Sequence, residues 1–420
     1  MTLGWLGIVR LGLVQAALGA IVVLTTSTIN RVMIVELALP AMVPGLFVTW
    51  HYALQVLRPS WGHGSDKGGK RTPWIIAGMA ALAVGGFGAA VSVHIMASNM
   101  VMGAIAATIA FTLIGGGVGA AGTNLLVLLA KRVAEGRRAA AATIVWIMMI
   151  VGFIITAALA GKFLDPFSTT RLMAVAGVIC AVAFLMTCAA IWRVEDGVQP
   201  TEQSVPARAR VPFGQAIAEV WADQTARRFA IFIFVSMLAY SAQDLILEPF
   251  AGLVFGFTPG QSTSLSGIQN SGVLLGMILV GGASTLMPRL LSLRNWTVLG
   301  CIGSAFALGF SNGVFAVAAI GSMFSMANSG GQSREGVRMG LFGASQAIAF
   351  GIGGFAGTVL VDISRAVLGS PVMAYATVFA IEAMFFLLAA ALATAVGKRE
   401  GFGDAANPLV LAARHQASGS

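Results

Sequence analysis

Long apolar runs separated by short polar stretches dominate this sequence and constrain its fold more than any other feature. Only 10% of the 420 residues are charged, whereas a soluble globular domain carries about 25% charged residues. Such a small number of charges cannot cover a surface that faces water, so much of the surface must face lipid. The mean hydropathy of +0.88 agrees with this interpretation. The sequence therefore predicts an integral membrane protein.

The apolar runs have the length of transmembrane helices, which need about 20 apolar residues to cross the hydrocarbon core. Measured in this way, the chain contains twelve candidate spans, and we expect an all-α membrane protein. The predicted spans are residues 8–29, 39–58, 73–95, 99–130, 139–162, 171–192, 229–256, 262–287, 294–311, 313–331, 337–361 and 371–397.

One long polar stretch, residues 193–228, divides the predicted spans into six and six. We therefore expect two six-helix halves joined by a linker. The predicted parts are an N-terminal half at 1–193, a cytoplasmic linker at 194–228, a C-terminal half at 229–397 and a cytoplasmic tail at 398–420.

The distribution of Lys and Arg predicts the orientation, because cytoplasmic loops carry an excess of these residues. With both termini in the cytoplasm, 21 basic residues fall on the cytoplasmic side and 4 on the opposite side. The formal net charge of +9 is thus explained by topology. We interpret it in this way rather than as a sign of nucleic-acid binding.

The loop between the second and third predicted spans reads Gly62-His63-Gly64-Ser65-Asp66-Lys67-Gly68-Gly69-Lys70-Arg71. It resembles the signature loop of the major facilitator superfamily, which implies a fold of two six-helix halves. Its candidate functional residues are Gly62, Asp66, Lys67, Gly69 and Arg71. The glycines permit a tight turn, and the carboxylate can accept hydrogen bonds from a helix N-terminus or pair with an Arg. The alternative is an ordinary basic loop that obeys the charge rule.

A short repeat supports two related halves. Glu-Gly-x-Arg ends at Arg138, at the start of the fifth predicted span, and again at Arg338, at the start of the eleventh. We expect these two arginines to contact Asp66 or helix ends. Ordinary anchoring at the membrane surface is the alternative.

Three further blocks carry a narrower resemblance. They are residues 28–37, Gly64-Ser65-Asp66 with Arg71 and Pro73, and residues 243–249 followed by Val254-Phe255-Gly256. These blocks resemble the PucC/LhaA family of purple phototrophic bacteria, a bacteriochlorophyll delivery branch of the major facilitator superfamily. The chain is most similar to its shorter members of the bacteriochlorophyll synthase chain type. It departs from the antenna-assembly members where residues 67–70 replace a longer polar insert.

The resemblance implies a non-enzymatic protein that delivers pigment or assists assembly of photosynthetic complexes. The implied ligand is bacteriochlorophyll or a precursor, with carotenoid as a further candidate. The implied partners are bacteriochlorophyll synthase and light-harvesting or reaction-centre apoproteins. The implied location is the bacterial inner, intracytoplasmic membrane, where the protein also contacts lipids.

Two other functions compete with pigment delivery. A proton-coupled secondary transporter of a small solute needs a titratable residue that faces a central cavity. A catalytic subunit of bacteriochlorophyll esterification would use a prenyl diphosphate, and membrane prenyl transferases present Asp-rich clusters that bind magnesium. The sequence contains no such cluster, so we expect at most a non-catalytic partner of the synthase.

His51 is the candidate pigment ligand, because a neutral imidazole can ligate the magnesium of a chlorin. Trp50 and Tyr52 flank it and can stack on a ring. The alternative is a histidine that serves helix packing. The cysteines form no motif that indicates a metal site.

Five charged residues lie in or near predicted spans, where charges are costly and usually face a cavity or a partner. Arg31 and Glu36 follow the first span, and Asp244 and Glu248 lie in the seventh. We expect Arg31 to pair with Asp244 or Glu248 across the halves. The alternative places all four in loops at the water interface. Glu382 lies near the middle of the last span and must be protonated, paired or bound to a partner.

Overall fold

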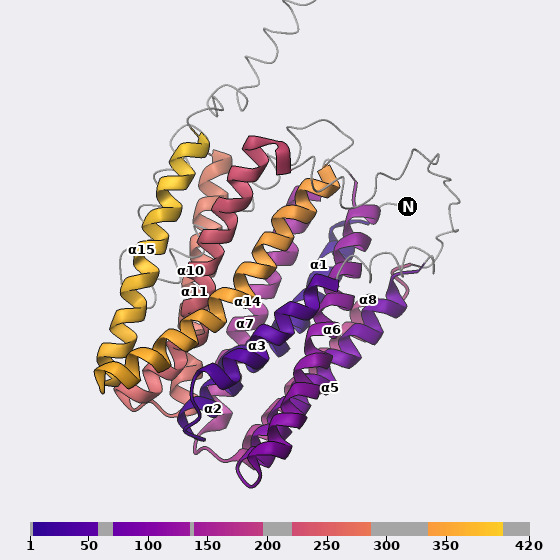
Figure 1. Cartoon of the computed structure of the whole chain (residues 1–420). Coiled ribbons are helices and arrows are strands. Elements are labelled where there is room, and N and C mark those ends of the chain that lie inside the picture. The colour runs from indigo at the N-terminus through magenta and orange to yellow at the C-terminus, as the bar shows by residue number, and fades with distance from the viewer. Residues whose placement is uncertain (1–2, 58–69, 135–137, 196–220, 287–334, 398–420) are drawn as a thin grey trace, which may run out of the picture.

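The computed structural model describes residues 3–57, 70–134, 138–195, 221–286 and 335–397, and these residues form a bundle of long helices (Figure 1). Eight of the described helices are long and apolar enough to cross a membrane. The prediction of an integral membrane protein is therefore confirmed.

The described helices follow the predicted spans closely. In the N-terminal half they are α1 (Trp5–Val23), the π-helix η1 (Leu24–Ile29), α2 (Asn30–Val35), α3 (Met42–Leu54), the short 3-10 helix η2 (Gln55–Leu57), α5 (Thr72–Met96), α6 (Met100–Arg132), α7 (Arg138–Leu164) and α8 (Thr169–Ile191). In the C-terminal half they are α10 (Gln224–Phe255), α11 (Pro259–Leu286), α14 (Glu335–Leu368) and α15 (Pro371–Gly397). The predicted spans 294–311 and 313–331 lie outside the described residues, as do most of the predicted linker and the predicted tail.

The first span is longer than the sequence predicts, because the helix continues from Trp5 to Val35 through a π-helical turn. Within this turn, Thr25 and Thr26 donate hydrogen bonds from their hydroxyls to carbonyl oxygens one turn earlier, at Val22 and Ile21. Such back-bonding serves carbonyls that a widened turn leaves poorly paired. Arg31 consequently lies inside a helix and not in a loop.

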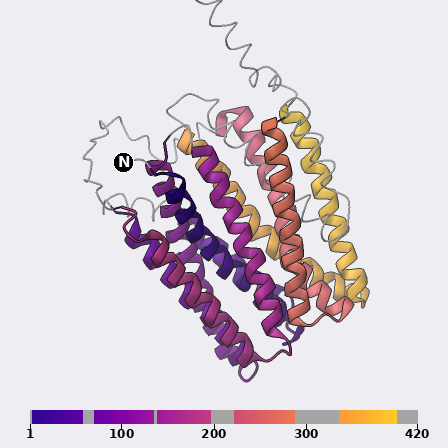
Figure 2. The same ribbon diagram turned by 180° about the vertical axis from the view of Figure 1, so that it is seen from behind.

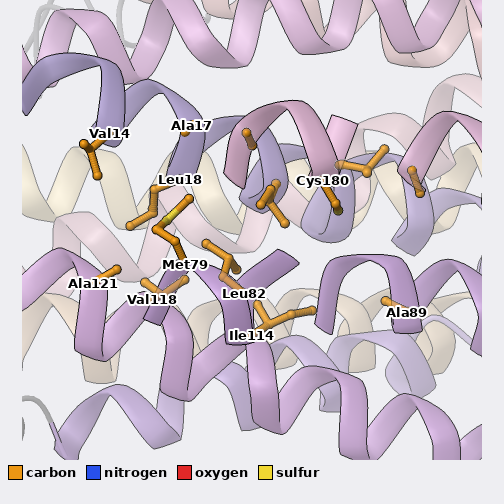
Figure 3. Close-up of a cluster of buried hydrophobic side chains, with 14 of the residues drawn as sticks. Val14, Ala17, Leu18, Met79, Leu82, Ala89, Ile114, Val118, Ala121 and Cys180 are labelled. Carbon is orange, nitrogen blue, oxygen red and sulfur yellow. The ribbon is translucent and has the colours of Figure 1, made fainter. Parts of the chain in front are cut away.

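Small residues allow neighbouring helices to approach closely, as is usual in membrane proteins. A Cβ atom on Gly78 of α5 would lie 2.6 Å from the backbone nitrogen of Ala121 in α6. Beside this contact, α1, α5, α6 and α8 enclose an apolar core that contains Leu18, Leu82 and Ile114 (Figure 3).

The two halves meet mainly along two helix pairs, α7 with α11 and α3 with α14, and also where α2 contacts α10 and where η1 contacts α10 and α11. The two main pairs lie between α5, α6 and α8 on one side and α10 and α15 on the other (Figures 1 and 2). Gly161 of α7 and Gly260 of α11 face each other, since a Cβ on Gly161 would lie 2.8 Å from the Gly260 carbonyl oxygen. We call the end of the bundle where α7 ends and α11 begins the Asp165 end. The opposite end, where α5 begins and α8 ends, is the Glu195 end.

Candidate functional site

A proline in α10 explains the first contact between the halves near the Asp165 end. Pro249 has no N–H, so the Leu245 carbonyl oxygen four residues earlier loses its helical partner. Asn30 of α2 donates a hydrogen bond from its side-chain nitrogen to this oxygen, at 2.7 Å. The amide of one half thus replaces a backbone hydrogen bond missing from the other half.

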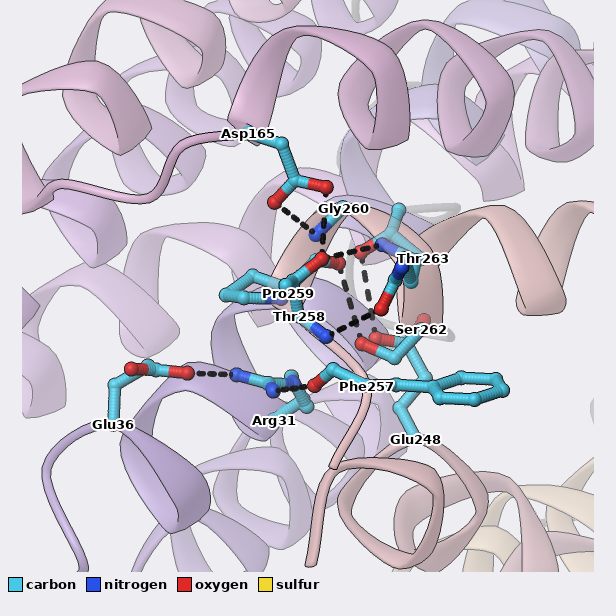
Figure 4. Close-up of polar contacts among 11 residues, drawn as sticks. Arg31, Glu36, Asp165, Glu248, Phe257, Thr258, Pro259, Gly260, Ser262 and Thr263 are labelled. Carbon is cyan, nitrogen blue, oxygen red and sulfur yellow. Dashed lines mark hydrogen bonds and ion pairs between the residues drawn. The ribbon is translucent and has the colours of Figure 1, made fainter. Parts of the chain in front are cut away.

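Arg31, the residue after Asn30, is only 1% exposed and also contacts the other half. Its guanidinium donates to the Glu36 carboxylate at 2.5 Å and to the Phe257 carbonyl oxygen at 2.5 Å (Figure 4). Gly252 leaves room for it, because a Cβ there would lie 3.0 Å from a guanidinium nitrogen. The structure therefore pairs Arg31 with Glu36 and not, as the sequence led us to expect, with Asp244 or Glu248. Glu36 is only five residues further along the chain, so its carboxylate lies next to the guanidinium.

Glu248 is 2% exposed and lies among hydroxyl groups from both halves. Ser27 and Ser266 donate to its Oε1 atom, the latter at 2.5 Å, and Thr263 lies 3.5 Å from Oε2. Thr28 completes this Glu248 cluster by accepting from the Thr263 hydroxyl at 3.3 Å. The π-helical turn brings Ser27 and Thr28 to face α10 and α11.

Two carboxylates at the Asp165 end each bind the beginning of a helix from the other half. Asp165, after α7, accepts from the Thr258 hydroxyl at 2.8 Å and from the Gly260 backbone N–H at 3.3 Å, where α11 begins (Figure 4). Asp362 of α14 accepts from the backbone N–H groups of Ala41 and Met42, at 3.0 and 2.8 Å, where α3 begins. Helix N-termini favour such carboxylates, because their first N–H groups lack helical partners.

Asp244 lies one helical turn from Glu248 on α10, and its side chain is exposed although Gln243 and Leu245 on either side are buried. Residues four apart share one face of a helix, so Tyr240, Asp244 and Glu248 form a row. Asp244 lies near enough to Tyr240 to interact with it electrostatically. Glu248 in this row bonds to Ser27 of the N-terminal half, and the exposed Asp244 carboxylate lies one turn before Glu248 on α10.

Trp50, His51 and Tyr52 do not line one surface on which a pigment ring could stack, because successive residues of a helix point about 100° apart. Trp50 is 44% exposed and donates from its indole nitrogen to the Thr112 hydroxyl at 2.9 Å. Tyr52 faces the other half, with its ring centre 5.4 Å from that of Phe350.

His51 is 1% exposed, and its Nε2 atom lies 3.0 Å from the Gln55 side-chain nitrogen. A histidine that ligates the magnesium of a chlorin needs open space on one side of its ring, where the macrocycle can lie. At 1% exposure, the His51 ring has no such open face in this arrangement of the helices.

Arg71 begins α5 at the Glu195 end and is buried. Glu195 accepts from the backbone N–H groups of Arg71 and Thr72 and from the Thr72 hydroxyl, at 2.6 to 3.0 Å. Burial alone raises the pKa of this carboxyl, but the hydrogen bonds from Thr72 and Arg71 and the nearby charge of Arg132 outweigh burial and lower it. Glu195 therefore caps α5 as an anion.

The other signature-loop residues, Gly62, Asp66, Lys67 and Gly69, lie outside the described residues. Arg138 is the first residue of α7, and Arg338 lies in the first turn of α14, as the repeat predicts. The contacts that we expect these two arginines to make with Asp66 or helix ends stay a prediction.

Glu382 lies within α15 and is 5% exposed. In the part of the chain that the structure describes, its Oε1 atom has no hydrogen-bond partner. This placement agrees with the expected intramembrane position. The structure describes the other four charged residues singled out from the sequence, and none of them pairs with Glu382.

The sequence-based prediction missed Asp165, Asp362, Glu195 and the four hydroxyl residues around Glu248. A signal existed for two of the carboxylates. Asp165 comes soon after the apolar run of the fifth predicted span, and Glu195 comes soon after the run of the sixth, close to Arg193. The pairing of each with a helix beginning far away in the sequence required the tertiary structure.

The sequence matches the family model described as "PUCC protein" at residues 28–308 and 302–401. It is 48% identical to the "Bacteriochlorophyll synthase 44.5 kDa chain" of Rhodobacter capsulatus, over 96% of this chain and 97% of that protein. The chain belongs to the PucC family. It is also 27% identical to the protein named PucC of the same organism, over 94% of this chain and 93% of that protein.

Solved structures with the same arrangement of helices are transporters. A point mutant of the nucleoside transporter NupG has a TM-score of 0.69 at 14% identity, and covers 93% of this chain and 100% of its own. The D-xylose–proton symporter has a TM-score of 0.66 at 13% identity, and covers 92% of this chain and 96% of its own. At such identities the likeness shows the fold alone, and that fold is the predicted major facilitator fold.

Proposed function

We propose that this protein binds bacteriochlorophyll or a precursor and delivers it during assembly of photosynthetic pigment–protein complexes. Its partners in this proposal are bacteriochlorophyll synthase and light-harvesting or reaction-centre subunits. The observation that carries the proposal is the 48% identity, along almost the whole chain, to a relative named as a bacteriochlorophyll synthase chain. The proposed location is the bacterial inner, intracytoplasmic membrane.

The proposed role is not catalytic. The relative's name includes the word synthase. The sequence, however, has no Asp-rich cluster of the kind that membrane prenyl transferases use to bind a diphosphate through magnesium. A transporter-like fold around an exposed carboxylate suits binding and movement of a ligand better than transfer of a prenyl group. We therefore propose a subunit that works beside the enzyme.

Purification from phototrophic membranes tests the proposal. In mild detergent, the protein should retain a pigment that absorbs in the near infrared, or should co-purify with synthase or antenna subunits. The control is the same protein from cells that make no bacteriochlorophyll, which should be colourless. A colourless preparation without partners from pigment-replete cells would contradict the proposal. Because His51 is enclosed, His51→Asn should leave the amount of bound pigment unchanged.

Proton-coupled transport of a small solute is the second candidate function. The exposed carboxylate of Asp244, on a helix face directed at the other half, favours it. Uptake of a solute into vesicles that is abolished by Asp244→Asn and by Glu382→Gln would support transport. Unchanged pigment binding in the same variants would show that the two functions use different residues.

A further inference from the structure

The Glu248 cluster gathers six side-chain oxygen atoms from three helices. Two belong to the Glu248 carboxylate of α10, two to Ser27 and Thr28 of η1, and two to Thr263 and Ser266 of α11. The Ser27 and Ser266 oxygens lie 3.1 Å apart, and those of Thr28 and Thr263 lie 3.3 Å apart. The cluster therefore joins the N-terminal half to the C-terminal half.

The charge of Glu248 has no direct counter-charge. The charge of Arg31 acts on Glu248, but the Arg31 guanidinium already donates to Glu36 and to the Phe257 carbonyl oxygen. Within the described parts of the chain, no ion pair joins Glu248 to a lysine or an arginine. An ionised carboxylate buried in a membrane protein is costly unless a positive partner balances it. The hydroxyl groups provide hydrogen bonds and no positive charge.

We propose that the Glu248 cluster is a binding site for a monovalent cation, Na⁺. The ligands are the Glu248 carboxylate and the hydroxyl oxygens of Ser27, Thr28, Thr263 and Ser266. One carboxylate balances one positive charge, whereas sites for divalent cations usually combine several carboxylates. Hard cations of this kind take oxygen ligands, and the cluster offers only oxygen.

The spacing of the oxygens suits an ion of this size. Oxygen ligands lie about 2.4 Å from Ca²⁺, and Na⁺ has nearly the same radius. In an octahedral shell, neighbouring oxygens then lie about 3.4 Å apart. The hydroxyl pairs and the Thr263–Oε2 pair are close to this value, at 3.1 to 3.5 Å. The shorter contacts of Ser27 and Ser266 with Oε1 are hydrogen bonds, which must lengthen when a cation binds between these oxygens. A hydroxyl has two lone pairs and a rotatable hydrogen, so it can donate to the carboxylate and still face a cation.

Asp244 gives the cation a route to the site. It lies one turn from Glu248 on the same face of α10, and its side chain is exposed. A second carboxylate on this path attracts cations toward the cluster. Because both halves supply ligands, a bound cation stabilises the arrangement in which they are in contact at the Asp165 end.

Thermal unfolding of the purified full-length protein tests this proposal. NaCl is titrated against choline chloride at constant ionic strength, with KCl as a size control. We expect the melting temperature to rise with Na⁺ and to saturate, and to rise less with K⁺. Thr263→Val and Ser266→Ala should each raise the half-saturating Na⁺ concentration by about tenfold, and Glu248→Gln should abolish the effect.

Ser271→Ala is the matched control, because Ser271 lies on α11 outside the cluster and its hydroxyl bonds to the Gly267 carbonyl oxygen. It should keep the response of the unmodified protein. Direct binding of radioactive Na⁺ to the unmodified protein provides a second measurement if Glu248→Gln fails to fold. Equal melting temperatures in Na⁺ and choline, or a melting temperature that depends on pH alone, would overturn the proposal. The outcome is independent of whether the protein binds pigment.

Discussion

Glu195 shows how one side chain fixes a helix at the Glu195 end of the bundle. It accepts hydrogen bonds from the first N–H groups of α5, although it follows α8 in the sequence. The same carboxylate accepts from the Thr72 hydroxyl at 2.6 Å. The contact therefore ties the beginning of the third span to the end of the sixth span.

Stability at low pH should depend on Glu195. Its pKa in the folded protein is lower than the ordinary value of 4.5, so the ionised form is the one that stabilises the fold. This contribution is present above pH 4.5 and is lost as the pH falls through the lowered pKa. Glu195→Gln should cost about 0.5–2 kcal/mol near neutral pH, the usual value of a helix cap.

The measurement is the melting temperature of both proteins between pH 3 and 7. The difference between them should shrink below about pH 4.5 as the carboxylate takes up a proton. Glu400→Gln, in the predicted tail, removes the same charge elsewhere and serves as the control. A difference that stays constant over the whole range would contradict the capping role.

At the scale of helices, Asp165 and Asp362 make equivalent contacts. Asp165 follows α7, the fifth predicted span, and caps α11, the eighth. Asp362 lies in α14, the eleventh predicted span, and caps α3, the second. An offset of six spans relates one contact to the other, as the two-half plan of the fold requires. Each half therefore binds a helix beginning of the other half at the Asp165 end.

Removing these two charges should open the Asp165 end. Asp165→Asn and Asp362→Asn should each weaken the contact by about 0.5–2 kcal/mol. Their effects should add, because the two sites share no partners. A cysteine at Ser262, which is fully buried, reports the opening through its reaction with an impermeant maleimide in a protein without its native cysteines.

Labelling should increase in each single variant and further in the double variant. Ser364→Ala, two residues after Asp362 on α14, should leave labelling at the level of the parent. Equal labelling in all of these proteins would show that the two carboxylates do not hold this end closed.

At the scale of the molecule, the distribution of basic residues predicts which end faces the cytoplasm. The Glu195 end holds Arg71, Arg132 and Arg193, and the Asp165 end holds Arg31, Lys162 and Arg365. Over the whole sequence, the imbalance is 21 to 4 in favour of the side of the Glu195 end. We therefore expect the Glu195 end to face the cytoplasm.

Reporter fusions test this orientation. A fluorescent protein fused after Ser420 should fluoresce, because we expect the C-terminus in the cytoplasm. Alkaline phosphatase fused after Ser98, between α5 and α6, should be active, because it should reach the opposite side. A fluorescent Ser98 fusion together with an active phosphatase at the C-terminus would reverse the assignment.

The helices were predictable because their signal is local. A span of about 20 apolar residues is recognised from the residues it contains, and the described helices begin and end near the predicted limits. Two spans are clearly longer than predicted. The first continues past residue 29 through the π-helical turn, and α14 continues past residue 361 to Leu368. That turn depends on hydroxyl groups bonding back to the helix and on the partners that they meet across the interface.

Composition and apolar run length alone predicted a chain that spans a membrane, and the resemblance of its motifs to known families predicted the major facilitator fold and the PucC family. The partners of each charged side chain were decided only by the tertiary structure. Arg31 pairs with Glu36 and not with Asp244, and Glu248 meets hydroxyl groups separated from it by 221 residues in one case. The physical reason is that a contact across two halves depends on where their helices cross. Apolar length fixes each helix, while close packing of small residues and helix caps fix the crossings.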